Sequence, residues 1–133
     1  SISLLKNLKK NKLNFKFSLP FQKTNWNLKL TRQIKEKNFK GVNIIWNFKS
    51  KFNKKRNWKN NTKEGGGILR FYFIHFFYFI SSLGKKIKIR EYILRKNIFS
   101  ISFEVDKKKV INFFINKNSK EKFSIFIKNK KKL

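Results

Sequence analysis

Alternating apolar and polar residues predict β-strands in several places along this chain. Residues 42–48, 86–90, 98–105 and 123–127 carry β-branched or aromatic side chains at about every second position. This period is typical of a strand with one buried face, because successive side chains point to opposite sides of a sheet. Residues 68–80 are an almost unbroken apolar and aromatic run. We interpret this run as a fully buried strand.

Helical patterns are fewer. Thr31 is a candidate N-cap for a short helix over residues 32–37, which are good helix formers, and Gly41 is a plausible end. After Asp106, an acidic cap candidate, apolar residues recur at helical spacing and predict an amphipathic helix over residues 106–116. We therefore expect an α+β fold, with an antiparallel sheet packed with about two helices, a long basic loop and basic terminal extensions.

The charge of the chain directs attention to its partners. Its 133 residues include 35 Lys and Arg against six Asp and Glu, a formal net charge of +29. Self-repulsion of this size favours a polyanionic partner, with nucleic acid first and an anionic membrane surface second. The hydrophobic content of 40%, with 17 Phe, predicts a folded core. We expect a basic arm over residues 1–16, one domain over residues 17–128 and a basic tail over residues 129–133.

The N-terminal arm and the origin of the chain allow further expectations. The arm is interpreted as solvated or bound to nucleic acid, with an amphipathic helix on a membrane surface as the alternative. Lys, Asn, Ile and Phe dominate the chain and Ala is absent. The four abundant residues have codons rich in A and T, which favours an organellar genome as the source.

The sharpest local feature is a basic loop over residues 49–67. Its basic side chains can pair with phosphates, and its three closing glycines allow a close approach to a partner. Trp58 can stack on a base or pack against the domain. A flexible, solvated loop tip is the alternative for the whole segment. The RNA-binding residues proposed from the sequence are Arg32, Lys49, Lys51, Lys54, Lys55, Arg56, Trp58, Lys59, Lys63, Gly65, Gly66, Gly67 and Arg70.

Catalytic and metal chemistry find little support in the sequence. There is no Cys, and the single His75 excludes a multi-histidine metal site. We expect His75 to be a core residue hydrogen-bonded to a neighbour. Glu104 and Asp106 lie two apart and could share a strand face, but we interpret them as a strand end and a helix cap. The glycine run matches no nucleotide-binding motif, so no enzyme activity and no cofactor are expected.

Several short segments, taken in their order along the chain, resemble one protein family. Leu-Thr-Arg-Gln-Ile at residues 30–34 looks like the start of a family helix, and Ile-Ile-Trp-Asn-Phe at residues 44–48 looks like a family strand. Ser-Phe-Glu at residues 102–104 and the pattern of residues 110–127 are similar to the family's later strands and last helix. Together they resemble the bacterial-type large-subunit ribosomal protein family uL16, in an organellar form.

The basic loop both supports this resemblance and departs from it. Its spacing is similar to that of the family's basic loop, which ends in a glycine–lysine repeat. Lys63, Glu64 and Gly66 break that repeat, and residues 85–97 look like an insertion. On this register the positions that match are Lys51, Lys55, Arg56, Gly65 and Gly67.

The resemblance implies a structural role in the large ribosomal subunit. It implies an α+β sandwich bound to rRNA near the central protuberance, with the basic loop directed to the peptidyl-transferase region. The implied partners are large-subunit rRNA, neighbouring ribosomal proteins and the A-site tRNA, without homo-oligomers, in the mitochondrial matrix. Two alternatives stay open: another organellar ribosomal protein, including one of the small subunit, and a basic accessory subunit of an organellar membrane respiratory complex.

Overall fold

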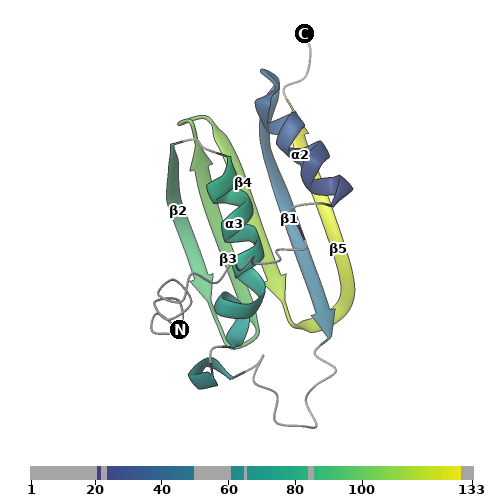
Figure 1. Cartoon of the computed structure of the whole chain (residues 1–133), viewed down its shortest axis with the longest axis vertical. Coiled ribbons are helices and arrows are strands. Elements are labelled where there is room, and N and C mark those ends of the chain that lie inside the picture. Colours follow the sequence, from purple (N-terminus) through teal and green to yellow (C-terminus); the bar gives the residue numbers. More distant parts are fainter. Residues whose placement is uncertain (1–20, 22–23, 50–60, 65, 84–85, 130–133) are drawn as a thin grey trace, which may run out of the picture.

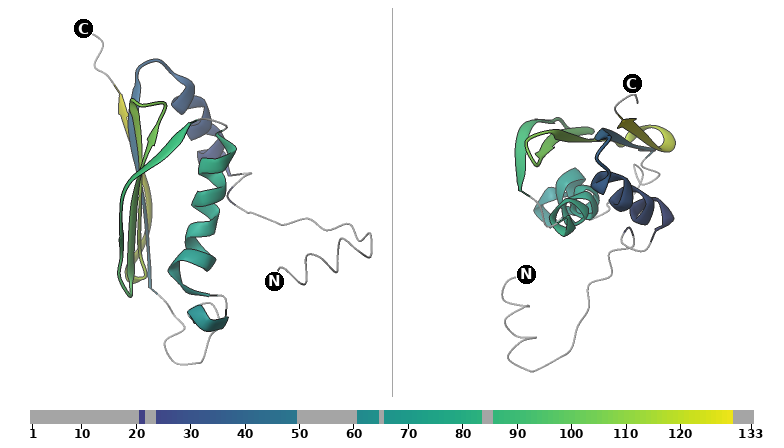
Figure 2. Two further views of the ribbon diagram at one scale, coloured as in Figure 1. Left: turned by 90° about the vertical axis from the view of Figure 1, so that its left-hand side faces the viewer. Right: turned by 90° about the horizontal axis from the view of Figure 1, so that it is seen from above.

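The fold has two layers, a five-stranded mixed sheet and a layer of helices on one of its faces (Figures 1 and 2). A computed structural model describes residues 21, 24–49, 61–64, 66–83 and 86–129. In chain order the elements are α2 (Asn25–Lys35), β1 (Phe39–Lys49), the 3-10 turn η3 (Thr62–Glu64), the π-helical turn η4 (Ile68–Phe73), α3 (Ile74–Ser82), β2 (Ile87–Leu94), β3 (Ile98–Val105), β4 (Lys109–Asn116) and β5 (Asn118–Asn129).

The α+β class is confirmed, but the expectation of an antiparallel sheet is wrong. The strand order is β2-β3-β4-β1-β5, and β1 runs parallel to β4 while the other neighbouring pairs are antiparallel. A parallel pair needs a long crossover connection. Here the helical segment 68–82 and the β2–β3 hairpin lie between β1 and β4, so β4 enters beside β1 in the same direction.

The core lies between the sheet and the helices. The four alternating segments predicted as strands lie in β1, β2, β3 and β5, with only Lys86 outside its strand, which confirms those predictions. In β3 and β4 every second residue is buried under the helices. Phe113 in the middle strand is fully buried and its ring lies 4.5 Å from that of Phe76 in α3. Lys109 of β4 donates a hydrogen bond to the Glu36 carbonyl at 3.3 Å, beyond the end of α2, and so ties that helix end to the sheet.

The apolar run over residues 68–80 is helical, so its assignment as a buried strand is wrong. The run forms η4 and then α3. Its length exceeds that of a typical strand, and an all-apolar run has no period that separates strand from helix. The buried subset nevertheless follows helical spacing, because its members recur three or four positions apart. That subset is Ile68, Tyr72, Phe73, Phe76, Phe79 and Ile80.

Residues 106–116 are a turn and a strand, so the predicted helix there is wrong. Asp106 and Lys107 have φ angles of 53° and 60° and reverse the chain between β3 and β4. Asp106 therefore starts a hairpin turn and does not cap a helix. Ile111 and Phe113 are buried two positions apart in β4, and this period of two outweighs the apparent helical spacing.

Two smaller boundary predictions also fail. Helix α2 begins at Asn25 with Thr24 at its N-cap position, so Thr31 lies inside the helix. Gly41 does not end a helix, since it lies within β1 opposite Val110 of β4. Among the ranges that the structure describes, no helix is both long enough and apolar enough to cross a membrane.

Candidate functional site

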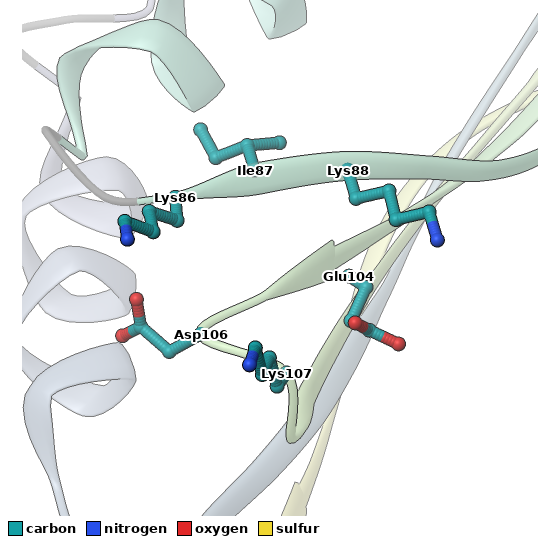
Figure 3. A pocket seen from close by; sticks show the side chains of 6 residues that line it. All are labelled: Lys86, Ile87, Lys88, Glu104, Asp106 and Lys107. Atoms are coloured by element: carbon teal, nitrogen blue, oxygen red, sulfur yellow. The ribbon is translucent and has the colours of Figure 1, made fainter.

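A charged hollow lies at one corner of the sheet, where β2 begins and β3 leads into the β3–β4 turn (Figure 3). It encloses about 530 Å³. Figure 3 shows side chains of both signs around it, from β2 on one side and from β3 and its turn on the other. The lining residues are Lys86, Ile87, Lys88, Glu104, Asp106 and Lys107.

The β3–β4 turn positions this hollow. Asp106 and Lys107 both adopt the left-handed backbone region, which Asp tolerates better than most residues. The Asp106 main-chain N–H donates a hydrogen bond to the Lys86 carbonyl at 3.1 Å, so the turn is joined to the start of β2. Further along, Lys88 of β2 lies directly opposite Glu104 of β3. These backbone pairings bring residues about twenty apart in the sequence to one rim.

The side chains of the hollow suit an anionic ligand. Its three lysines outnumber its two acids by one. Lysine ammonium groups donate charge-assisted hydrogen bonds to carboxylate or phosphate oxygens. The carboxylates of Glu104 and Asp106 can accept hydrogen bonds from ligand hydroxyls. Across the described ranges no three His, Cys, Asp or Glu side chains form a group that could hold a metal ion.

His75 lies on α3, among the aromatic residues of the helix layer. Its ring centre is 4.9 Å from that of Phe21. Within the described part of the chain its Nδ1 atom is buried without a hydrogen-bond partner, so the expectation of a hydrogen-bonded core histidine is wrong for this atom. Burial lowers the pKa of His75 from its usual 6.5, because a low-polarity environment disfavours the charged imidazolium.

We expect the fold to lose stability as the pH drops below about 6.5, and the His75→Gln variant to lack this part of the pH dependence. The pKa of His75 is lower in the folded state than in the unfolded chain, so the unfolded state takes up the proton first on acidification. The stability that neutral His75 contributes is therefore complete above the pKa of the unfolded chain. It is lost as the pH falls toward the lower pKa of the folded state. Urea unfolding of both proteins across this range measures the effect, and parallel stability curves would contradict it.

The residues proposed from the sequence as an RNA site fall into three groups. Lys63, Gly66, Gly67 and Arg70 lie together around η3 and the start of η4, where Arg70 Nη1 donates to the Thr62 carbonyl at 3.3 Å. Arg32 lies on α2 and Lys49 at the end of β1, and α2 is far from η3 in Figures 1 and 2. The remaining members lie outside the described residues: Lys51, Lys54, Lys55, Arg56, Trp58, Lys59 and Gly65.

The charged hollow was not found from the sequence, although two signals pointed toward it. The alternation over residues 86–90 placed Lys86 and Lys88 on one strand face, and Glu104 and Asp106 were noted as able to share a face. Both pairs lie at the hollow. The prediction of a helix after Asp106 hid the hairpin turn that brings them together.

Solved dehydrogenases share this fold. The WlbA (WbpB) dehydrogenase from Thermus thermophilus in complex with NAD and alpha-ketoglutarate matches 95% of this chain at a TM-score of 0.67 and 18% identity. The complex of the same enzyme with NAD and UDP-GlcNAcA matches 95% of this chain at a TM-score of 0.69 and 19% identity. A dehydrogenase (MviM) from Clostridium difficile matches 96% of this chain at a TM-score of 0.67 and 13% identity. The matches cover 45%, 46% and 41% of those proteins, so the chain spans less than half of their length. No protein-family model and no curated protein matches the sequence.

These structures overturn the ribosomal interpretation. The predicted membership of the uL16 family is wrong, because the matching folds are those of dehydrogenases. The predicted roles in the large ribosomal subunit and in a respiratory complex are also wrong. The predicted partners, rRNA, ribosomal proteins and A-site tRNA, are wrong for the same reason. The expectation of a non-enzyme is contradicted as well, since the fold is shared with enzymes.

The described residues do not fit a dinucleotide cofactor. A dinucleotide-binding fold has a mostly parallel sheet with helices on both faces and a glycine-rich turn that leads from a strand into a helix. Here one strand pair is parallel and the helices lie on one face (Figure 2). Gly67 precedes η4, but a Cβ there would lie 2.6 Å from the Thr62 methyl carbon. The positive φ of Gly67 (94°) and the space taken by Thr62 therefore account for glycine at this position without a bound pyrophosphate.

Proposed function

We propose that this fold is the part of an NAD-dependent dehydrogenase-type oxidoreductase that does not hold the dinucleotide, and that its charged hollow takes the anionic end of the substrate. The observation that carries the proposal is the fold likeness. It covers nearly all of this chain but less than half of each dehydrogenase. Since the described residues lack the features of a dinucleotide-binding unit, the counterpart is the other portion of those enzymes.

The ligands of the similar structures support an anionic substrate. The two complexes of the Thermus thermophilus enzyme contain alpha-ketoglutarate and UDP-GlcNAcA. The first is a dicarboxylate, and the second carries a diphosphate and a carboxylate. Lys86, Lys88 and Lys107 can bind and orient such groups, and a hollow of about 530 Å³ lies within the usual size range of small-molecule sites.

The test is a binding titration of the purified chain with alpha-ketoglutarate and, separately, with NAD. We expect alpha-ketoglutarate to bind, and the double variant Lys86→Gln/Lys107→Gln to weaken its binding about tenfold, because each solvent-exposed ion pair contributes up to about 1 kcal/mol. NAD is expected not to bind. Tight binding of NAD by this chain would contradict the assignment to the other portion.

A matched control separates the hollow from the overall positive charge. Lys120→Gln/Lys122→Gln removes the same charge from β5, away from the hollow. It should leave the affinity for alpha-ketoglutarate within about twofold, since exposed charges beyond a Debye length are largely screened. An equal loss of affinity in both double variants would show non-specific attraction and sink the proposed substrate site.

Three earlier expectations are kept as proposals alongside this one. They are the domain boundaries at residues 16 and 128, the long basic loop over residues 49–67, and a mitochondrial location, for which the residue composition supports an organellar origin. None of them depends on a ribosomal role.

A further inference from the structure

Strand β2 forms one edge of the sheet and is open on its outer side. It pairs with β3 alone among the described strands, and Figure 1 shows it at the margin, with α3 over the neighbouring strands. Seven of its eight residues are exposed. An edge strand offers unpaired N–H and C=O groups to another chain.

The register shows which residues face outward. Arg95 and Ile98, at the end of the β2–β3 hairpin, exchange both backbone hydrogen bonds, at 2.8 and 3.3 Å. Hydrogen-bonded and non-bonded pairs alternate along an antiparallel ladder. The pairs Tyr92–Ile101 and Leu94–Phe99 are therefore non-bonded. The N–H and C=O groups of Tyr92 and Leu94 consequently point away from β3, along the open edge.

The same two residues place apolar side chains beside that edge. Tyr92 is 67% exposed and Leu94 49%, on the sheet face that the helices cover, because their partners in β3 are buried there. The apolar surface continues onto the helix layer. Phe99, opposite Leu94, lies 4.7 Å from the Phe73 ring, and Phe73 lies 6.4 Å from the exposed Phe77.

The opposite edge of the sheet is less open. In β5 the ring of Phe123 lies 5.2 Å from that of Trp26 in α2, so a helix covers part of the apolar side of that strand. No comparable ring contact with a helix is found for Tyr92 in the described part of the chain. The β2 edge is therefore the better place for an added strand.

Charge selects the partner of this edge. Residues 86–96 contain five basic side chains, Lys86, Lys88, Arg90, Arg95 and Lys96, against the single Glu91. A second copy of the chain would bring the same excess to the edge, on top of a net charge of +29 on each molecule. An acidic segment would be attracted by the same charges.

We propose that the β2 edge binds an extended acidic polypeptide segment by β-strand addition. The segment pairs with the outward backbone groups of Tyr92 and Leu94. Its apolar side chains, alternating with acidic ones, lie against these residues and toward Phe77. Backbone hydrogen bonds supply affinity, and side-chain contacts supply specificity. This inference goes beyond the proposed substrate site and does not depend on it.

The probe is a fluorescein-labelled peptide of sequence Asp-Val-Glu-Val-Asp-Val-Glu, titrated with the full chain and followed by fluorescence anisotropy. Its control is the same peptide N-methylated at the three valines, which keeps the acidic charge and removes hydrogen-bond donors. We expect the control to bind about tenfold more weakly, since each lost hydrogen bond is worth roughly 0.5–1.5 kcal/mol. Amide chemical-shift changes should concentrate on residues 87–94.

Two substitutions at one position test the protein side. Tyr92→Pro removes an outward N–H without removing a bond to β3, and proline is tolerated on edge strands in that orientation. It should weaken peptide binding about tenfold. Tyr92→Thr also removes the ring but keeps the N–H, and should retain more of the affinity. Circular dichroism checks that both variants fold. If Tyr92→Pro does not fold, the N-methylated peptide still tests the proposal on the unmodified protein.

Three results would overturn the proposal. Equal binding of the parent and N-methylated peptides would mean that charge alone attracts them. Chemical-shift changes confined to β5 would place the added strand at the other edge. A dimer in analytical ultracentrifugation that excludes the peptide and is broken by Tyr92→Pro would mean that a second copy occupies β2.

Discussion

The Phe113→Ala variant is expected to lose about 3–5 kcal/mol of unfolding free energy, the usual cost of removing a fully buried ring. Phe113 has no exposed surface and lies in the middle strand of the sheet. Its ring centre is 4.5 Å from that of Phe76, 6.1 Å from Phe103, 6.2 Å from Phe73 and 6.3 Å from Phe79. The four neighbouring rings come from the helix layer and from β3, and they cannot all move into the space that the Phe113 ring leaves. Much of the cavity, and of its cost in unfolding free energy, therefore remains.

Urea unfolding followed by circular dichroism measures this loss. Phe126→Ala is the matched control, because it makes the same change in a strand of the same sheet at a side chain that is 52% exposed. Its cost should stay below about 1 kcal/mol. If both variants lost the same stability, Phe113 would not be the centre of the core.

The Gly41→Ala variant is the second change with a large expected effect, a loss of about 1–3 kcal/mol, typical of overpacking. A Cβ at Gly41 would lie 2.5 Å from the backbone carbonyl oxygen of Val110, its partner in the parallel β1–β4 pair. The atoms that this Cβ would meet belong to the backbone of Val110, so the clash is relieved only if the two strands move apart. Elsewhere in a strand, alanine in place of glycine would normally stabilise the fold, because glycine loses more chain entropy on folding.

The sign of the change in unfolding free energy therefore shows whether the close approach of β1 and β4 requires glycine at position 41. Hydrogen exchange of the β1 and β4 amides localises it, since opening this strand pair should lower protection there more than in β2. Ser124→Ala, at the position of β5 opposite Ile45 of β1, serves as the control and should change stability by less than about 0.5 kcal/mol. A stabilised Gly41→Ala protein would mean that the two strands tolerate a side chain between them.

The family resemblance failed for a physical reason. It rested on short segments and on an order of elements that included a strand over residues 68–80 and a helix over residues 106–116. Both assignments were wrong. The high positive charge supported nucleic acid as a partner, but charge bears on association and not on fold. The charge itself remains a property of the chain, and the acidic partner proposed for β2 is one consequence of it.

The sequence by itself determined the elements whose side chains alternate with a clear period, and the large positive net charge of the chain. Strands β1, β2, β3 and β5 were predictable because one face of each differs from the other. Tertiary structure decided what local pattern leaves open. It made residues 68–80 a helix, since a run apolar on every side fits either form until a sheet covers one face. It set β4 parallel to β1, and it joined Lys86 to Asp106, because pairing between distant strands depends on the whole fold.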